Sequence, residues 1–305
     1  LLVLRAPLVR LDLSDHGARA ATRLRNVAGS DPVVRVTAAL VTATARMHRS
    51  RYADVVAILT EVPLGDVDLA LRAEVLTKLG DAHERCRDWH RAITALREAV
   101  VCFRKSGNLA GMSGCHGTLA ALYRDHLGDL RAATAHGTKA LRLADAAGDW
   151  KTRAQVRLVV LRTALARGDA AVAAELAGQA RCLSERNGDP IGQTWCLTAE
   201  ADVHRARGDL SAARRSADRA LGLARRTRRP DAESAALLAL ASIELAAGDR
   251  AAARRVAHAA LRLQDRFDSP VERAGVAKVL AEIDGQLPSG AGRPGTAPAT
   301  PEISM

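Results

Sequence analysis

Residues 168–180 read Gly-Asp-Ala-Ala-Val-Ala-Ala-Glu-Leu-Ala-Gly-Gln-Ala, and this stretch indicates the architecture of the whole chain. Its Gly-Asp pair recurs at residues 128–129, 208–209 and 248–249, and an Arg-Asp version stands at 87–88. Small residues follow each aspartate at the fourth, eighth and eleventh positions, here Ala173, Ala177 and Ala180; the earliest copy has Leu96 at the eighth. The aspartates recur with a nearly constant period of about 40 residues, and such a period predicts an array of stacked repeats.

A second turn signal lies about twenty residues after the aspartate and divides each unit into two helices. These turns are Gly107-Asn108, Gly148-Asp149, Gly188-Asp189 and Pro230-Asp231. Glycine adopts the left-handed conformation that ends a helix, and Asp or Asn accepts backbone N–H bonds at the start of the next. Each segment of roughly 18 residues spans ~27 Å as a helix. We call the two helices of each predicted hairpin helix A and helix B. The small residues of helix B share one face and allow it to approach helix A closely.

The unit resembles the tetratricopeptide repeat. Six residues match that pattern in one unit: Leu79, Gly80, His83, Ala92, Leu96 and Ala99. The period of 40 instead of 34 and the missing tryptophan depart from the pattern. Versions with longer helices look like the C-terminal regions of LuxR-type (maltose-regulator) and SARP-type bacterial transcriptional regulators. The resemblance covers about residues 65–266 and implies an all-α fold, a right-handed superhelical solenoid of antiparallel helix hairpins.

The predicted organisation has four parts. Residues 1–64 form degenerate N-terminal helices, at 14–28, 31–49 and 52–60, the last two being a first hairpin that keeps the repeat loosely. Residues 65–266 form five hairpins of about 40 residues, and residues 267–286 form a capping helix. Residues 287–305 are rich in Pro, Gly, Ala and Thr and are predicted to be a disordered tail. The first residue is Leu rather than Met, so we expect either an unusual start codon or a longer protein with upstream domains.

Composition narrows the class of protein. Apolar residues make up 48% of the chain but aromatic residues only 2%, so the core must consist of Ala, Leu and Val, which favours close-packed helices over strands. Five cysteines without a C-x-x-C pair, in a chain without a secretory signal, indicate reduced thiols and a cytoplasmic location. The apolar residues at the N-terminus are too few and too charged to span a bilayer, so no membrane association is expected.

No catalytic motif is present, so we expect neither an enzyme, a cofactor nor a metal site. The sequence has no phosphate-binding Gly-rich loop, G-x-S-x-G elbow or H-E-x-x-H motif. His83 and His204 occupy the repeat position usually held by Tyr. We favour a packing role for both, and a pH-sensitive or metal-binding site is the alternative. Cys182 and Cys196 end and begin successive helices; a redox pair is the alternative to buried structural thiols, which are more common.

The candidate binding surface is the concave groove lined by the A helices. Matching offsets place acidic and polar residues at one end, then basic and aromatic residues, then apolar ones: Glu74, Thr77, Asp81 and Glu84; Arg124 and Asp125; Gln155 and Arg162; Trp195, Asp202 and Arg205; Ala235, Leu238, Ser242 and Leu245. Thr77 and Asp81 replace the Lys/Asn clamp with which chaperone-binding relatives hold a peptide C-terminus.

We hypothesise that Arg124, Arg162, Trp195 and Arg205, with Asp202 beside them, form a site for an acidic and hydrophobic protein or peptide segment. The alternative is that Arg162 and Asp202 pair between adjacent repeats on a solvated wall, since exposed ion pairs are common and weak.

The basic residues gather toward the C-terminal half. Residues 205–266 hold fourteen arginines against seven acids, and the chain has a net charge of +11. Arg214-Arg215 and Arg254-Arg255 stand at equivalent places of two successive repeats and would stack as a stripe on the convex side. Such a stripe can bind nucleic acid. No aromatic residues interleave it, and Arg-rich, Ala-rich usage also follows from codon bias, so we do not expect nucleic-acid binding by this region.

The sequence therefore predicts a non-catalytic protein-protein interaction module, which by resemblance is the sensor or regulatory region of an actinobacterial-type transcriptional regulator. Two alternatives stay open: a free-standing scaffold or adaptor, and an accessory region of a larger multidomain enzyme.

Overall fold

The computed structural model describes residues 31–48, 51–65, 67–267 and 270–285, which form thirteen helices and no strand. The helix predicted at 14–28 and the tail predicted at 287–305 lie outside these residues. The helices are α3 (Pro32–His48), α4 (Tyr52–Thr60), α5 (Leu69–Arg85), α6 (Trp89–Lys105), α7 (Leu109–Asp125), α8 (Leu130–Ala147), α9 (Trp150–Ala166), α10 (Ala170–Arg186), α11 (Pro190–Ala206), α12 (Leu210–Arg226), α13 (Pro230–Ala246), α14 (Arg250–Phe267) and α15 (Pro270–Ile283).

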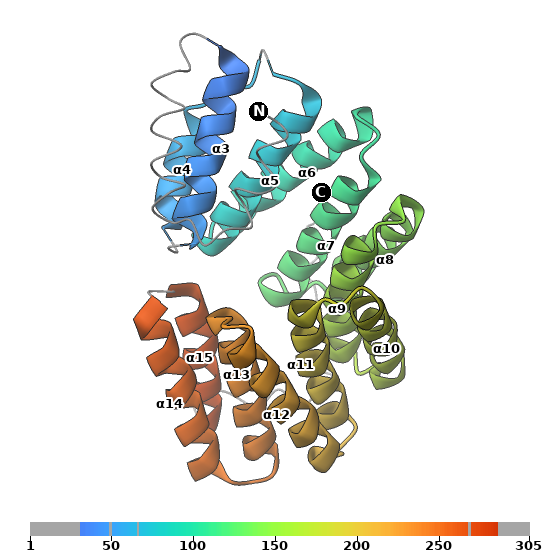
Figure 1. The fold of residues 1–305 in the computed structure, drawn as a ribbon, viewed down its shortest axis with the longest axis vertical. Helices are drawn as coiled ribbons and strands as arrows, with labels where there is room; N and C mark the ends of the chain where they lie inside the picture. Colours follow the sequence, from blue (N-terminus) through green and yellow to red (C-terminus); the bar gives the residue numbers. More distant parts are fainter. Residues whose placement is uncertain (1–30, 49–50, 66, 268–269, 286–305) are drawn as a thin grey trace, which may run out of the picture.

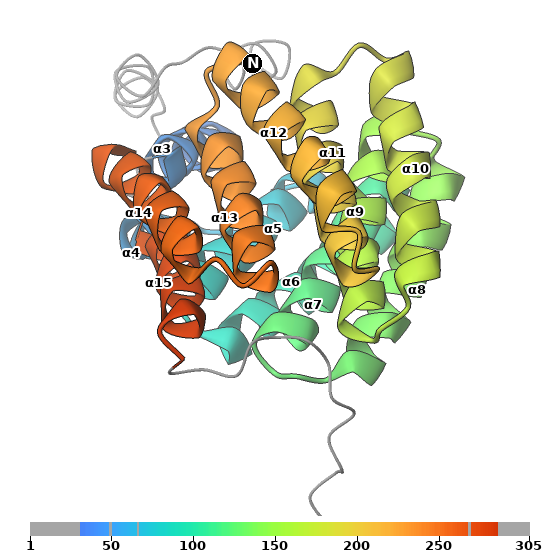
Figure 2. The ribbon, with the colours of Figure 1, turned by 90° about the horizontal axis from the view of Figure 1, so that it is seen from below.

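The helices stack in chain order as a right-handed, all-α solenoid, as the sequence predicts. Figure 1 shows an arc that runs from α3 and α4 through α7–α10 to α14 and α15. Each odd-numbered helix from α5 to α13 pairs with the next as helix A and helix B. From α7 onward each helix A also packs against the next helix A, whereas α5 reaches α7 through Thr77, whose hydroxyl lies 3.6 Å from the sulfur of Cys115. The A helices are therefore the continuous inner layer. In Figure 2, α9, α11 and α13 lie toward the interior, whereas α10 and α14 lie at the periphery.

The small residues of helix B are buried against helix A, which confirms the packing predicted from the spacing. Ala173, Ala177 and Ala180 of α10 have at most 2% of their surface exposed, and the equivalent alanines of α12 and α14 are fully buried. In the first copy Leu96 fills this place, and the opposing Gly80 makes room for it. A Cβ built on Gly80 would stand 2.7 Å from Cγ of Leu96, which is closer than real Cβ contacts allow. The spacing of small side chains thus sets the distance between paired helices.

Most turns use the predicted mechanism. At the Arg87-Asp88 turn, Arg87 takes the left-handed conformation without glycine, with φ of 63°, and two further turns differ from the prediction. Gly168 has φ of 84°, in the left-handed region, but the Asp169 side chain accepts no cap hydrogen bond. The prediction that Asp169 caps its helix as the other aspartates do is therefore wrong. It pairs instead with Arg167, whose Nε lies 3.7 Å from the carboxylate.

The turn predicted at Pro230-Asp231 is displaced by two residues. Arg228 takes the left-handed place with φ of 52°, and Arg229 stands at the N-cap without a side-chain cap bond. Pro230 is the first helical residue, where its missing N–H costs nothing. Asp231 then pairs with Arg229, with atoms 2.6 Å and 2.9 Å apart. The prediction failed because neither a glycine at the left-handed position nor an Asp or Asn at the N-cap marks this turn.

The two ends of the described array differ from its middle. The α4 helix has nine residues, whereas every later helix B has 17 or 18. At the other end, α15 takes the place of the next helix A: it begins one repeat period after α13, and Asp284 pairs with Arg254 as Glu244 pairs with Arg214. Leu280 and Ala281 are half-buried, whereas the equivalent Leu240 and Ala241 are buried beneath α14.

Candidate functional site

Arg124, the first predicted site residue, is fully engaged by the protein itself. Only 8% of its side chain is exposed. Its Nε donates to Asp125 at 2.7 Å, and its Nη1 donates to the main-chain oxygen of Val159 at 3.0 Å and to Thr163 at 3.4 Å. Because these partners lie on α7 and α9, Arg124 ties two successive A helices together. It has little left to offer a ligand.

Three other predicted residues come together on α9 and α11, and their charges are unbalanced. Asp202 lies 3.8 Å from Nη2 of Arg205, which is an ion pair longer than a direct hydrogen bond. Burial raises the pKa of Asp202 above its usual range, against the opposing attraction of Arg205 and Arg162. Asp202 therefore has one ion-pair partner, Arg205, and feels the charge of a second guanidinium, Arg162, from farther away.

Both arginines keep donors without acceptors. Arg162 is exposed and makes no ion pair within 4 Å in the described part of the chain. The Nε of Arg205 is buried and has no hydrogen-bond partner among the same residues. A buried charged donor without a partner, such as the Nε of Arg205, is costly, so an oxygen ligand that reached it would be stabilised. The alternative of a direct Arg162–Asp202 ion pair does not describe this structure.

Trp195 lies two helical turns before Asp202 on α11 and is half-buried. Residues seven apart share one helix face, so the indole and the Asp202 carboxylate belong to the same side of α11. The surface thus combines an aromatic ring with two guanidinium groups, which suits a segment carrying both apolar and acidic groups.

The acidic end of the groove is built from α5 and α7. Burial raises the pKa of Asp81 to about 6 and also raises that of Glu84. Glu84 lies 3.6 Å from Nε2 of His126, and the His126 ring stacks on Trp89 with centroids 3.9 Å apart. Trp89, at the start of α6, therefore packs against the next hairpin.

The apolar end predicted for the groove is covered. Leu238 and Leu245 of α13 pack against a core cluster that contains Val276 and Ile283 of α15. The α15 helix thus occupies the place where the sequence suggested an open apolar wall.

A buried histidine pair was not anticipated from the sequence. His116 of α7 and His136 of α8 lie with their Nδ1 atoms 2.9 Å apart, and the His136 ring stacks on Tyr123 with centroids 5.4 Å apart. Burial lowers the pKa of His116 to about 4, aided by Lys139, His136 and Arg104. Both rings are therefore neutral at pH 7. Their only sequence signal is position, eight and seven residues after the N-caps of their helices.

The convex basic stripe is partly neutralised. Arg214 pairs with the buried Glu244 at 2.6 Å, and Arg254 pairs with Asp284. Arg215 and Arg255 remain exposed. Half of the predicted stripe therefore holds successive hairpins together.

The described residues contain no other candidate for chemistry. All five cysteines are free, and burial raises the pKa of Cys196 to about 11, so its thiol is protonated at neutral pH. His83 lies in a packed position with 9% of its surface exposed. Within the described ranges, no three His, Cys, Asp or Glu side chains gather as metal ligands. No helix in that part of the chain combines the length and apolarity needed to cross a bilayer.

Solved structures with the same arrangement are repeat proteins. The chain superposes on a Rap protein complexed with competence and sporulation factor with a TM-score of 0.69, 12% identity and coverage of 95% of this chain and 85% of that one. NprR in complex with its cognate peptide NprX gives 0.65 and 12%, covering 91% and 81%. The structural neighbours are tetratricopeptide-repeat proteins.

One neighbour is a signal transduction ATPase with numerous domains, by its description. The STAND protein with a tetratricopeptide repeat sensor from Pyrococcus horikoshii gives a TM-score of 0.60 at 17% identity, and the superposition covers 88% of this chain but 40% of that protein. No protein-family model matches the sequence, and no curated protein matches it significantly. At these identities the likeness concerns the fold alone.

Proposed function

We propose that this chain is a non-catalytic recognition module that binds an acidic, partly apolar protein or peptide segment on the inner surface of α9 and α11. The observation that carries the proposal is the excess of positive charge around Asp202: it pairs with Arg205, Arg162 also acts on it electrostatically, the Nε of Arg205 has no partner among the described residues, and Trp195 lies on the same side of α11 as Asp202. A carboxylate can accept from an arginine at two points, while apolar groups bury against the indole. The complex of the NprR neighbour with its cognate peptide, and that of the Rap neighbour with competence and sporulation factor, support the choice of a protein or peptide ligand.

Arg124 has a different role in this proposal. Because it donates to Val159 and Thr163 of α9, it positions the helix that carries Arg162 and does not contact the ligand.

Fluorescence polarisation with defined peptides tests the proposal. The probes are a labelled octapeptide of alternating Glu and Leu and its Lys/Leu counterpart. We expect the acidic peptide to bind preferentially, and the triple variant Arg162→Ala, Trp195→Ala, Arg205→Ala to lose at least tenfold in affinity. The matched control is Arg215→Ala with Arg255→Ala, which removes the same charge from the convex side. Equal affinity in the triple variant and the control would refute the inner site.

We further propose, from the resemblance and from the sensor described for the STAND neighbour, that the module is the regulatory region of a transcriptional regulator. Sequencing the coding region upstream of Leu1 distinguishes this role from its alternatives. An open frame that encodes a DNA-binding domain supports the regulator. A nearby stop codon with a ribosome-binding site supports a free-standing adaptor, and a catalytic domain supports an accessory region of an enzyme.

A further inference from the structure

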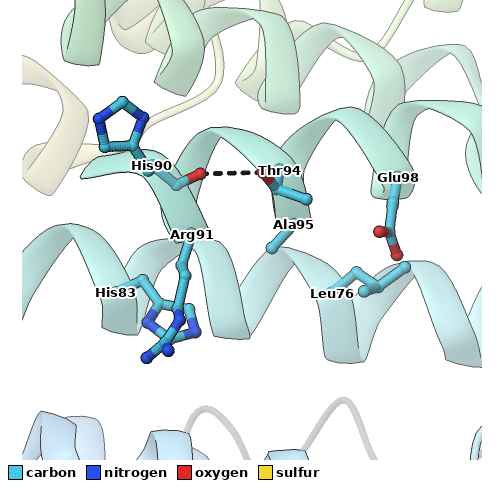
Figure 3. Close-up of a pocket in the computed structure, with 7 residues that line it drawn as sticks. All are labelled: Leu76, His83, His90, Arg91, Thr94, Ala95 and Glu98. Carbon is cyan, nitrogen blue, oxygen red and sulfur yellow. Dashed lines mark hydrogen bonds between the residues drawn. The ribbon is translucent and has the colours of Figure 1, made fainter. Parts of the chain in front are cut away.

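A hollow of about 300 Å³ lies in the crease between α5 and α6, away from the residues of the proposed inner site. Leu76 and Ala95 form its apolar floor, and His83 lies at one end (Figure 3). Arg91 and Glu98 stand on α6 at its rim, seven residues apart, which is ~10 Å along a helix.

The α7–α8 hairpin shows what fills this place in the next repeat; counting from α5, the α5–α6 pair is called the first hairpin below and the α7–α8 pair the second. Counted from the helix N-caps Asp68 and Asn108, Leu76 corresponds to His116 and His83 to Tyr123. Counted from Asp88 and Asp129, Ala95 corresponds to His136. The imidazole of His136 contacts His116 and stacks on Tyr123. The α5–α6 hairpin has a methyl group at this position, so its hollow lies where the α7–α8 hairpin places a planar ring from its own chain.

The preceding helix B also differs between the two hairpins. Across the second hairpin, Arg97 of α6 reaches over and donates to the Tyr123 hydroxyl at 2.9 Å. The residue at the same distance from the N-cap of α4 is Thr60, the last residue of that short helix. Its hydroxyl donates to Val56 of its own helix at 2.7 Å. The first hairpin therefore lacks both the filling ring and the side chain that closes over it.

The walls of the hollow suit a ring with charged neighbours. Burial lowers the pKa of His83, so its imidazole is neutral at pH 7 and offers an uncharged aromatic face. Glu98 is exposed and makes no ion pair among the described residues. Arg91 is 75% exposed on its side chain and lies 3.4 Å from Asp88, in a loose surface pair. One end of the rim thus presents a cation and the other a carboxylate.

We propose that the crease between α5 and α6 is a second binding site, which takes an aromatic side chain of a partner segment. An acidic residue on one side of the ring faces Arg91, and a basic residue on the other faces Glu98. This site is independent of the inner surface on α9 and α11, so either proposal can fail without affecting the other.

NMR titration of the uniformly ¹⁵N-labelled chain tests this site at pH 7.5. The probes are the blocked tripeptides Asp-Phe-Lys and Lys-Phe-Asp, with Ala-Phe-Ala and the two Leu-centred counterparts for comparison. Of the two charged Phe peptides, one can place its Asp at Arg91 and its Lys at Glu98 at the same time. We expect that peptide to shift the amide signals of Leu76 and Ala95 and to bind at least threefold more tightly than Ala-Phe-Ala. Absence of these shifts, or equal binding of the Leu-centred peptides, would overturn the proposal.

Filling the hollow provides the sharpest variant. Ala95→His copies the residue of the second hairpin, and we expect it to abolish the shifts. Val101→His places the same ring on an exposed position of α6 outside the crease and should leave them unchanged. Shifts that persist in Ala95→His would contradict the site. Should Ala95→His fail to fold, Glu98→Gln decides: it leaves the hollow open and the Arg91 contact intact, and it must lower the affinity of the charged peptide while leaving that of Ala-Phe-Ala unchanged.

Discussion

The guanidinium of Arg124 donates a 3.0 Å hydrogen bond to the main-chain oxygen of Val159, 35 residues further along the chain. Residues of helix interiors usually keep their carbonyl oxygens for their own helix. Here a charged donor from α7 adds a second bond to an α9 carbonyl, while Asp125 balances its charge. The contact joins two inner helices without any helix B between them.

We expect Arg124→Ala to lower the free energy of unfolding by about 2 kcal/mol, because bonds from a charged donor with 8% exposure are lost. Urea denaturation followed by circular dichroism measures the change. Arg162→Ala is the matched control: its side chain is exposed without an ion pair in the described chain, so its effect should stay within about 0.5 kcal/mol. Equal effects would mean that Arg124 is not a structural tie.

The histidine pair should make stability depend on pH. The pKa of His116 is about 4 in the folded protein and 6.5 in the reference state. Between these values the unfolded chain binds more protons than the folded one, so the free energy of unfolding falls as the pH is lowered from 6.5 to 4. The loss due to His116 is on the order of 3 kcal/mol.

Denaturation curves at pH 4.5, 5.5 and 7 measure this dependence. The comparison is the double variant His116→Leu with His136→Ala, which carries the residues of the first hairpin. It should show a shallower dependence on pH than the natural chain. An unchanged slope would mean that other groups cause the acid sensitivity.

Asp81 should act in the opposite direction. Its pKa is raised to about 6 from 3.8, so the folded protein binds the extra proton between these values, and stability due to this group is lost as the pH rises through 6. We expect Asp81→Asn to raise the free energy of unfolding at pH 7 by about 1 kcal/mol, with no gain at pH 3.5. A gain that is the same at both pH values would exclude ionisation of Asp81 as its cause.

Two aspartates at equivalent turns, Asp129 and Asp169, should differ in their contribution to the free energy of unfolding. Asp129 accepts from the backbone N–H of Ala132 at 2.8 Å, whereas Asp169 accepts no cap bond. Asp129→Ala should therefore cost about 1 kcal/mol, and Asp169→Ala only a few tenths. Thermal unfolding of the two single variants makes the comparison. A larger loss from Asp169→Ala would show that its carboxylate caps α10 in solution.

Arg228 and Gly188 occupy equivalent left-handed positions in successive repeats, with φ of 52° and 59°. A residue with a side chain is strained there by roughly 1 kcal/mol. Arg228→Gly should therefore raise the melting temperature and Gly188→Arg should lower it. The same sign for both variants would contradict the assignment of strain to Arg228.

The repeat period predicted the fold well because it reflects contacts within one hairpin. Ala173, Ala177 and Ala180 are buried as their spacing requires, since a helix face is fixed by local geometry. The turn at Arg228 was misplaced because its backbone conformation follows from its place in the array and not from its residue type.

The candidate site was predictable only in part. Offsets along the A helices placed Arg162, Asp202 and Arg205 on one surface, and the structure brings these three together. The offsets could not show that Arg124 donates to the main-chain oxygen of Val159. That bond depends on the rotamer of a long side chain and on an acceptor in another hairpin. Nor could they show the hollow over Ala95, which exists because a neighbouring hairpin has a ring where this one has a methyl group.

The proline that opens α11 and the proline that opens α13 stand one repeat period apart, each as the first residue of its helix. Excision of residues 190–229 would therefore join Asp189 directly to Pro230 and leave a helix start of the same chemistry. The shortened chain would keep the spacing between its turns. The α10 helix would then take the place of α12 and pack against the face of α13 that α12 now contacts. Evolution can thus lengthen or shorten this protein by whole hairpins, and each such step changes which charges of the inner surface become neighbours.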